Sequence, residues 1–152
     1  MANTFSQIHI QIVFAVQGRD AIIHSSWEDN LYKYITGIVQ KKEQKMMAIN
    51  GMPDHIHFLI GLRPSCCLAD LIRDIKKASN EYIKENKYSK CKFNWQEGYG
   101  AFSYSYWDVD KIITYIHNQK VHHDKKSFKE EYEALLKDFN VAYDEKYLFE
   151  YR

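Results

Sequence analysis

The sequence predicts an α+β fold of the ferredoxin-like (RRM-like) type, a βαββαβ antiparallel sheet with additional C-terminal helices. Three observations predict it: a period-two strand near the start, two amphipathic helical segments, and a glycine-proline turn joining two short strands. The length of 152 residues suits one domain with a sizeable core. We therefore expect a single domain over 1–152, with its core at about 5–121 and a C-terminal helix and tail at about 127–152.

The first half of this order follows from hydrophobic spacing. Ile8, Ile10, Ile12 and Phe14 alternate with His9, Gln11 and Val13, as in a strand. After the break at 18–20, apolar residues recur at helical spacing over about 26–42, where Ser25 or Ser26 can cap the helix. Residues 45–50 read as a short strand, ended by the Gly51-Met52-Pro53-Asp54 turn, and 55–62 as the next strand.

The second half repeats a helix and a strand and then adds helices. Leu68 to Ile83 shows helical apolar spacing, and the polar stretch 86–95 is expected to be a loop. The aromatic-rich segment 99–106 contains the fourth strand. Asp108 can cap a third helix that runs to about residue 121, and a fourth helix is expected at about 128–139. Two helices would cover one face of the sheet, leaving the other face free for a site or a partner.

Composition excludes several classes of protein. No apolar run is long enough to span a membrane, and no signal peptide is evident, so we expect a cytoplasmic protein. The three cysteines form no CxxC pair, which argues against a disulfide framework or a thiolate zinc site. A net charge of +1 argues against a protein that coats nucleic acid by charge alone.

The segment Asp54-His55-Ile56-His57 carries the strongest chemical signal. Side chains alternate along a strand, so His55 and His57 share one face while Ile56 points to the core. Two imidazoles side by side on a rigid strand form half of a cation site. A triple-histidine nucleotide hydrolase would need a further histidine at position 59, which is Leu59.

A second signal is the segment Tyr115-Ile116-His117-Asn118-Gln119. On a helix, positions i and i+4 project from the same face, so Tyr115 and Gln119 lie together. The Gln119 amide oxygen can be a third, neutral metal ligand, and Tyr115 is then a candidate nucleophile beside the cation. The rival tyrosines 99, 104 and 106 lie in or near a strand and lack a ligand one helical turn away.

These residues resemble the single-tyrosine HUH transposases of the insertion-sequence 200/605 type, which include REP-associated tyrosine transposases. The resemblance rests on His55-Ile56-His57 followed by Tyr115-x-x-x-Gln119 and covers about residues 5–140. It implies a DNA transposase in which Tyr115 attacks single-stranded DNA and forms a 5′-phosphotyrosine. It also implies Mg²⁺ or Mn²⁺ held by His55, His57 and Gln119, a homodimer, and recognition of hairpins at element ends. Tyr115 could serve its own subunit or the partner.

Several other polar and aromatic residues have both a functional and a structural interpretation. Asp54 could orient His55 by accepting a hydrogen bond from its imidazole, or simply belong to the turn. The polar stripe with Arg73, Lys76 and Lys77 could hold DNA or be ordinary surface, whereas Lys120, close behind Gln119, is better placed to meet DNA. Lys125 and Lys126 also follow Gln119 closely in the chain and are likewise better placed to meet DNA. Aromatic residues could stack on bases or fill a dimer interface; these are Tyr99, Phe102, Tyr104, Tyr106 and Trp107.

Two alternatives to a mobile transposase follow from the same residues. A domesticated relative would use the same chemistry to process repeated chromosomal hairpins. A nucleic-acid-binding module would keep the sheet without catalysis, but the presence of all four expected chemical groups, on His55, His57, Tyr115 and Gln119, argues against it.

Overall fold

The computed structural model describes residues 4–17, 22–122 and 127–144. Its strands are β1 (His9–Ala15), β2 (Lys45–Met52), β3 (His55–Gly61) and β4 (Gly100–Tyr104). Its helices are α1 (Glu28–Lys41), α2 (Leu68–Glu85), α3 (Val109–His117), α4 (Gln119–His122) and α5 (Phe128–Asp138), with a 3₁₀ turn at Tyr106–Asp108. The predicted order of elements and the α+β class are confirmed.

All strand pairs are antiparallel, and the sheet order is β2-β3-β1-β4. The strand that carries the histidines is therefore central, between β2 and β1. Across that centre, His57 is paired with Val13 of β1 and Asn50 of β2. A side chain on such a strand is held on both sides by backbone ladders, which makes β3 a rigid base for a site.

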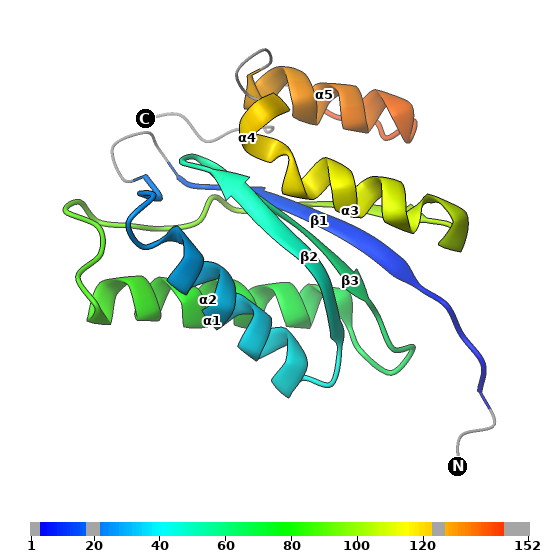
Figure 1. Cartoon of the computed structure of the whole chain (residues 1–152), viewed down its shortest axis with the longest axis horizontal. Coiled ribbons are helices and arrows are strands. Elements are labelled where there is room, and N and C mark those ends of the chain that lie inside the picture. Colours follow the sequence, from blue (N-terminus) through cyan, green and yellow to red (C-terminus); the bar gives the residue numbers. More distant parts are fainter. Residues whose placement is uncertain (1–3, 18–21, 123–126, 145–152) are drawn as a thin grey trace.

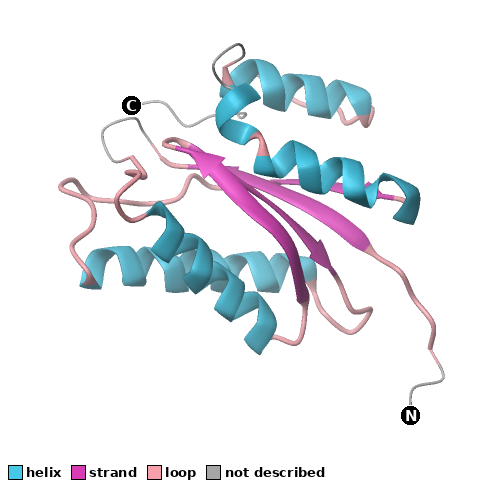
Figure 2. Ribbon diagram, in the orientation of Figure 1, coloured by secondary structure: helices cyan, strands magenta, loops and turns pink. Residues whose placement is uncertain are grey.

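The two faces of the sheet carry different elements, as Figures 1 and 2 show. α1 and α2 cover one face and bury the main core, which includes Ile12, Phe58 and Ile60. The face predicted to be free is instead covered by α3, α4 and α5, which pack on Val13, Leu59 and their neighbours. The expectation of an open face was wrong because Val13, Ala15, Ala48 and Leu59 supply it with apolar area that the C-terminal helices bury.

Helix ends differ from the predicted ones in two places. α1 begins after Trp27, whose side chain makes no cap bond, so neither Ser25 nor Ser26 caps it. Asp108 precedes α3 but also makes no side-chain cap bond. The third helix was expected to continue to about residue 121, but α3 ends at His117 and α4 begins at Gln119, with a break at Asn118.

Candidate active site

The two histidines of β3 lie side by side on the face covered by α3 to α5. Both side chains are fully buried, and their ring centroids are 5.1 Å apart. The predicted shared face is therefore observed. Ile56, between them, points into the main core on the opposite face.

Each imidazole is held through its Nδ1 atom. His55 Nδ1 lies 2.7 Å from Asp54 Oδ1, and His57 Nδ1 lies 2.9 Å from Gln11 Oε1. When Nδ1–H donates to these acceptors, the lone pair of the neutral ring sits on Nε2. Both Nε2 atoms then face the space between β3 and α5, with lone pairs available to a cation.

The electrostatic environment of His55 combines opposing effects. Burial lowers its pKa, but hydrogen bonds to Asp54 and to Glu131, with the negative charges of both, outweigh burial and raise the pKa above 6.5. The surroundings thus favour positive charge at this position, whether carried by a proton or by a metal ion.

The site also contains a buried carboxylate that was not predicted from the sequence, that of Glu131 on α5. Its Oε1 lies 2.8 Å from His57 Nε2 and 3.6 Å from His55 Nε2, and the residue is 5% exposed. The signal was available: Glu131 stands on the apolar face of α5, three residues after Phe128 and five before Leu136, both buried. An acidic residue inside an apolar helical stripe indicates a partner in the core.

Tyr115 and Gln119 converge on the same carboxylate despite the helix break between them. The Tyr115 hydroxyl donates to Glu131 Oε2, and Gln119 Nε2 lies 3.4 Å from the same oxygen. The Tyr115 ring stands edge-on to His57, with centroids 5.9 Å apart. Burial first, and then the charge and hydrogen bond of Glu131, raise the pKa of the Tyr115 phenol well above 10.

This donor set fits a divalent cation. Ligand atoms of His55, His57 and Glu131 all lie within 4.8 Å of one another. Two ligands at right angles around an ion with bonds of about 2.1 Å are about 3 Å apart, close to the 2.8 Å between His57 Nε2 and Glu131 Oε1. Among the described residues, the fully buried Gln119 Oε1 finds no hydrogen-bond partner, as expected of an amide oxygen that serves as a ligand.

The basic side chains predicted to meet DNA fall in two places. α2 packs on the opposite face of the sheet from the histidines, so Arg73, Lys76 and Lys77 are separated from them. Lys76 donates to the backbone oxygens of Gln96 (2.8 Å) and Gly98 (2.5 Å), a structural bond between α2 and the loop before β4. Arg73 pairs with acidic residues of its own helix, and Lys77 is exposed beside the groove between α1 and α2.

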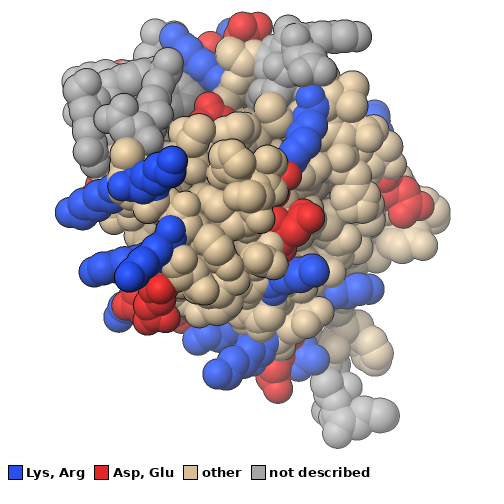
Figure 3. Space-filling view, turned by 60° about the vertical axis from the view of Figure 1, so that its left-hand side comes forward, with Lys and Arg blue, Asp and Glu red and all other residues tan. Residues whose placement is uncertain are grey.

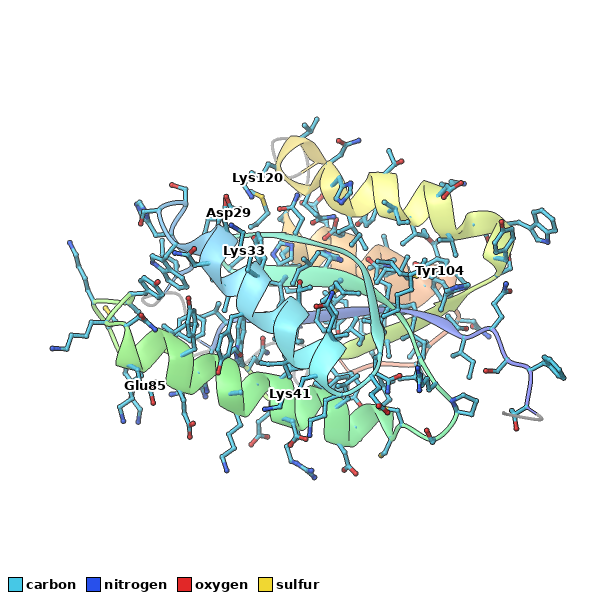
Figure 4. The ribbon with its side chains drawn as sticks, turned by 60° about the horizontal axis from the view of Figure 1, so that its bottom comes forward. Asp29, Lys33, Lys41, Glu85, Tyr104 and Lys120 are labelled. Carbon is cyan, nitrogen blue, oxygen red and sulfur yellow. The ribbon has the colours of Figure 1, made fainter. Side chains whose placement is uncertain are left out.

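Lys120 alone of the four lies on the same side as the site. It reaches Glu28 at the start of α1 (3.1 Å) and the backbone oxygen of Gly51 (3.1 Å), and its side chain is half exposed. Figure 4 shows it near the N-terminal end of α1. Lys125 and Lys126 lie outside the described residues. On the face shown in Figure 3, several basic side chains stand next to acidic ones, and the described residues form no continuous basic patch there.

The aromatic group predicted near the fourth strand divides into buried and exposed members. Phe102 is buried against α5, and Tyr104 is half-buried beside Gln11. Tyr99, just before β4, is 38% exposed, and Tyr106 and Trp107, in the turn before α3, are 57% and 86% exposed. Only the exposed members can stack on a base or meet another chain.

Comparison with known proteins agrees with this architecture. The family described as "Transposase IS200 like" matches residues 4–119. A solved structure assigned as a transposase from Deinococcus radiodurans R1 is 20% identical, with a TM-score of 0.62 over 78% of this chain and 95% of that one. A REP-associated tyrosine transposase bound to a REP hairpin is 15% identical, with a TM-score of 0.61 over 81% of this chain and 73% of that one. No curated protein sequence matches.

None of the described helices has the length and apolar character needed to cross a membrane.

Proposed function

We propose that this chain, which belongs to the IS200-like transposase family, is a metal-dependent enzyme that cuts and rejoins single-stranded DNA through Tyr115. The observation that carries the proposal is the meeting of four groups from three elements. His55 and His57 of β3, Tyr115 of α3 and Gln119 of α4 all approach the buried carboxylate of Glu131. Such a site unites a nucleophile with a cation site, an arrangement suited to phosphodiester transfer.

In the proposed reaction, Tyr115 Oη forms a bond to the scissile phosphorus while the bond to the 3′ oxygen breaks. The phenol loses its proton, the departing strand leaves as a 3′-OH, and a 5′-phosphotyrosine remains. Attack by a different 3′-OH reverses these steps and joins a new strand. One phosphoester bond is made for each one broken, so no external energy source is needed.

A divalent ion, Mg²⁺ or Mn²⁺, held by His55, His57 and Gln119 would polarise the phosphate and offset the charge that develops during attack. The protein's own groups prepare for this. Asp54 and Gln11 hold the two imidazoles by Nδ1, which keeps both Nε2 atoms directed at the site. Because burial raises the pKa of Tyr115, the phenol is a poor nucleophile until positive charge is brought beside it.

The proposed substrate is single-stranded DNA, with a hairpin near the cleavage point. Support comes from the family and from the structural neighbour that was solved with a REP hairpin. That neighbour is also consistent with the alternative function, that of a domesticated enzyme that processes chromosomal repeats by the same chemistry. Repeated hairpins scattered through the genome, rather than flanking this gene alone, would favour that alternative. We further propose that the protein forms a homodimer, as expected from the family resemblance.

The test is a covalent adduct assay. Labelled single-stranded DNA from the gene's flanks is incubated with protein and Mg²⁺ or Mn²⁺ and run on a denaturing gel. Wild type should give a metal-dependent protein–DNA band that Tyr115→Phe abolishes. Tyr106→Phe is the matched control, because Tyr106 is exposed and lies outside the site. Persistence of the band in Tyr115→Phe would assign the nucleophile elsewhere, and no band in wild type, with DNA bound, would favour a binding module.

A further inference from the structure

Glu131 contacts every group of the proposed site. One oxygen, Oε1, faces the Nε2 atoms of His57 (2.8 Å) and His55 (3.6 Å). The other, Oε2, accepts from the Tyr115 hydroxyl and lies 3.4 Å from Gln119 Nε2. The carboxylate therefore lies between the cation-binding atoms and the nucleophile and joins them.

Burial of this carboxylate requires positive charge or hydrogen-bond donors nearby. A carboxylate that is 5% exposed is strongly disfavoured unless a cation or hydrogen bonds compensate it. His55 and His57 pair with this carboxylate, and both imidazoles must be neutral to ligate a metal. When these imidazoles are neutral, a divalent ion among them supplies the missing charge, and the carboxylate in turn adds an anionic ligand to an otherwise neutral set.

The placement of Glu131 is fixed by the packing of α5. Ser127 caps the helix: its hydroxyl accepts from the Glu130 backbone N–H and donates to Glu130 Oε1, so α5 starts at Phe128, three residues before Glu131. The Phe128 ring stacks on the His55 ring at 4.0 Å, and Tyr132 stacks on Phe128 at 5.4 Å. Phe128 thus docks the start of α5 on the histidine strand, and the Glu131 carboxylate is directed inward toward the histidines.

We propose that Glu131 is the anionic ligand of the cation site and, through its second oxygen, the residue that positions Tyr115. The inference rests on the proposed function for the role of Tyr115, but the ligand assignment stands on the geometry of His55, His57 and Glu131. Glu131 takes part in the site by binding the ion and by accepting the tyrosine hydrogen bond, so α5 is a component of the active site.

The ligand assignment is tested without DNA. Mn²⁺ binding to the full chain is measured by calorimetry for wild type, Glu131→Gln and Glu130→Gln. The last is a matched control: Glu130 is adjacent and exposed, its replacement removes the same charge, and the glutamine amide oxygen can still accept the hydrogen bond from Ser127 Oγ. We expect Glu131→Gln to weaken Mn²⁺ binding at least about tenfold, as loss of supporting groups at metal sites does, and Glu130→Gln to leave it unchanged. Glu131→Asp keeps the charge and should recover part of the affinity.

Equal or tighter Mn²⁺ binding by Glu131→Gln would overturn the assignment. It would mean that the Glu131 side chain occupies the cation position without being a ligand and is displaced when the metal binds. Wild type that binds no Mn²⁺ would overturn the assignment too. Circular dichroism and thermal unfolding without metal identify a variant that fails to fold. If Glu131→Gln does not fold, the Mn²⁺ affinities of Glu131→Asp and Glu130→Gln are compared instead. Because this measurement needs no DNA, failure of the ligand role is separate from failure of the proposed function.

The positioning role is tested by the rate of the covalent adduct at saturating Mn²⁺. Glu131→Ala removes the acceptor of the Tyr115 hydroxyl, so the rate should fall even when the cation site is full. An unchanged or faster rate under saturation would overturn this role. A wild type that forms no adduct, while Glu131→Gln still loses Mn²⁺ affinity, would contradict the proposed function but leave the ligand assignment standing.

Discussion

His57 Nδ1 lies 2.9 Å from Oε1 of Gln11, a fully buried amide on the neighbouring strand β1. The amide group of Gln11 donates in turn to the Tyr104 hydroxyl, at 2.8 Å. Gln11 is therefore fixed from both ends, which orients its oxygen toward His57. An imidazole whose Nδ1–H is bound in this way presents Nε2 to a metal in one orientation.

Replacing Gln11 should weaken metal binding although Gln11 touches no ion. Gln11→Leu keeps the approximate size but removes the acceptor for His57, so the ring can rotate or change tautomer. We expect Mn²⁺ affinity to fall about 10- to 100-fold, as for other supporting residues of metal-bound histidines. Calorimetry measures it, with Gln7→Leu as the control, because Gln7 is exposed just before the same strand. Unchanged affinity would mean that β3 alone orients His57.

Asp54 should have a smaller effect of the same kind. Its carboxylate accepts from His55 Nδ1 but is 55% exposed, so solvent screens much of its charge. Asp54→Asn keeps the preference for the turn and the shape of the side chain while removing the charge. We expect Mn²⁺ affinity to drop several-fold, less than for Gln11→Leu, by the same assay. An affinity equal to that of wild type would assign Asp54 to the turn alone.

Tyr115 meets His57 within one chain, which makes a prediction for mixed subunits. If the site works as it stands, a mixture of Tyr115→Phe and His57→Ala proteins should form no covalent DNA adduct, since every chain lacks one essential group. An exchange of tyrosine helices between subunits would restore complete sites in the mixture. The adduct gel distinguishes the two, with co-purification of differently tagged chains as the control for mixing.

The sequence predicted most of this site because its signals were local. His55 and His57 lie two residues apart on a strand, and the period of two alone puts them on one face. Tyr115 and Gln119 were paired by helical spacing, and they do converge, although the helix breaks at Asn118. Asp54 was found because it adjoins His55 in the chain.

Glu131 and Gln11 could not be found in that way, because their partners are distant in sequence. Glu131 is 74 residues from His57, and Gln11 is 46 residues from it. Both contacts depend on strand order and on how α5 docks, which no local pattern specifies. The same limit explains the error about the second face of the sheet. Apolar residues such as Val13 and Leu59 share this face with Gln11 and the two histidines, and the helices that cover them come from the far end of the chain.

Tyr104 makes the free energy of unfolding depend on pH in the alkaline range. Burial, as the largest cause, raises the pKa of its hydroxyl from 10 to about 12, against the opposing effect of the Gln11 hydrogen bond. The pKa of Tyr104 in the folded state exceeds its value in the unfolded state. The stabilising contribution of the neutral Tyr104 hydroxyl to folding is therefore fully present below pH 10 and is lost as pH rises from 10 to about 12. Tyr104→Phe should therefore lose less stability than wild type over this interval in urea unfolding. Parallel curves would show that Tyr104 is not the group responsible.

Trp107 is the exposed aromatic residue best suited to contact an unpaired base. It is 86% exposed in the turn that leads from β4 into α3, the helix that carries Tyr115. Stacking of a base on an aromatic side chain contributes about 1–3 kcal/mol, so Trp107→Ala should weaken binding of single-stranded DNA by about 5- to 150-fold. Thermal stability should stay the same, because so exposed a side chain contributes little to the core. Fluorescence anisotropy with a labelled strand measures the affinity, and sedimentation of the same variant measures its assembly. A dimer that dissociates while DNA affinity per chain is unchanged would assign Trp107 to a subunit interface.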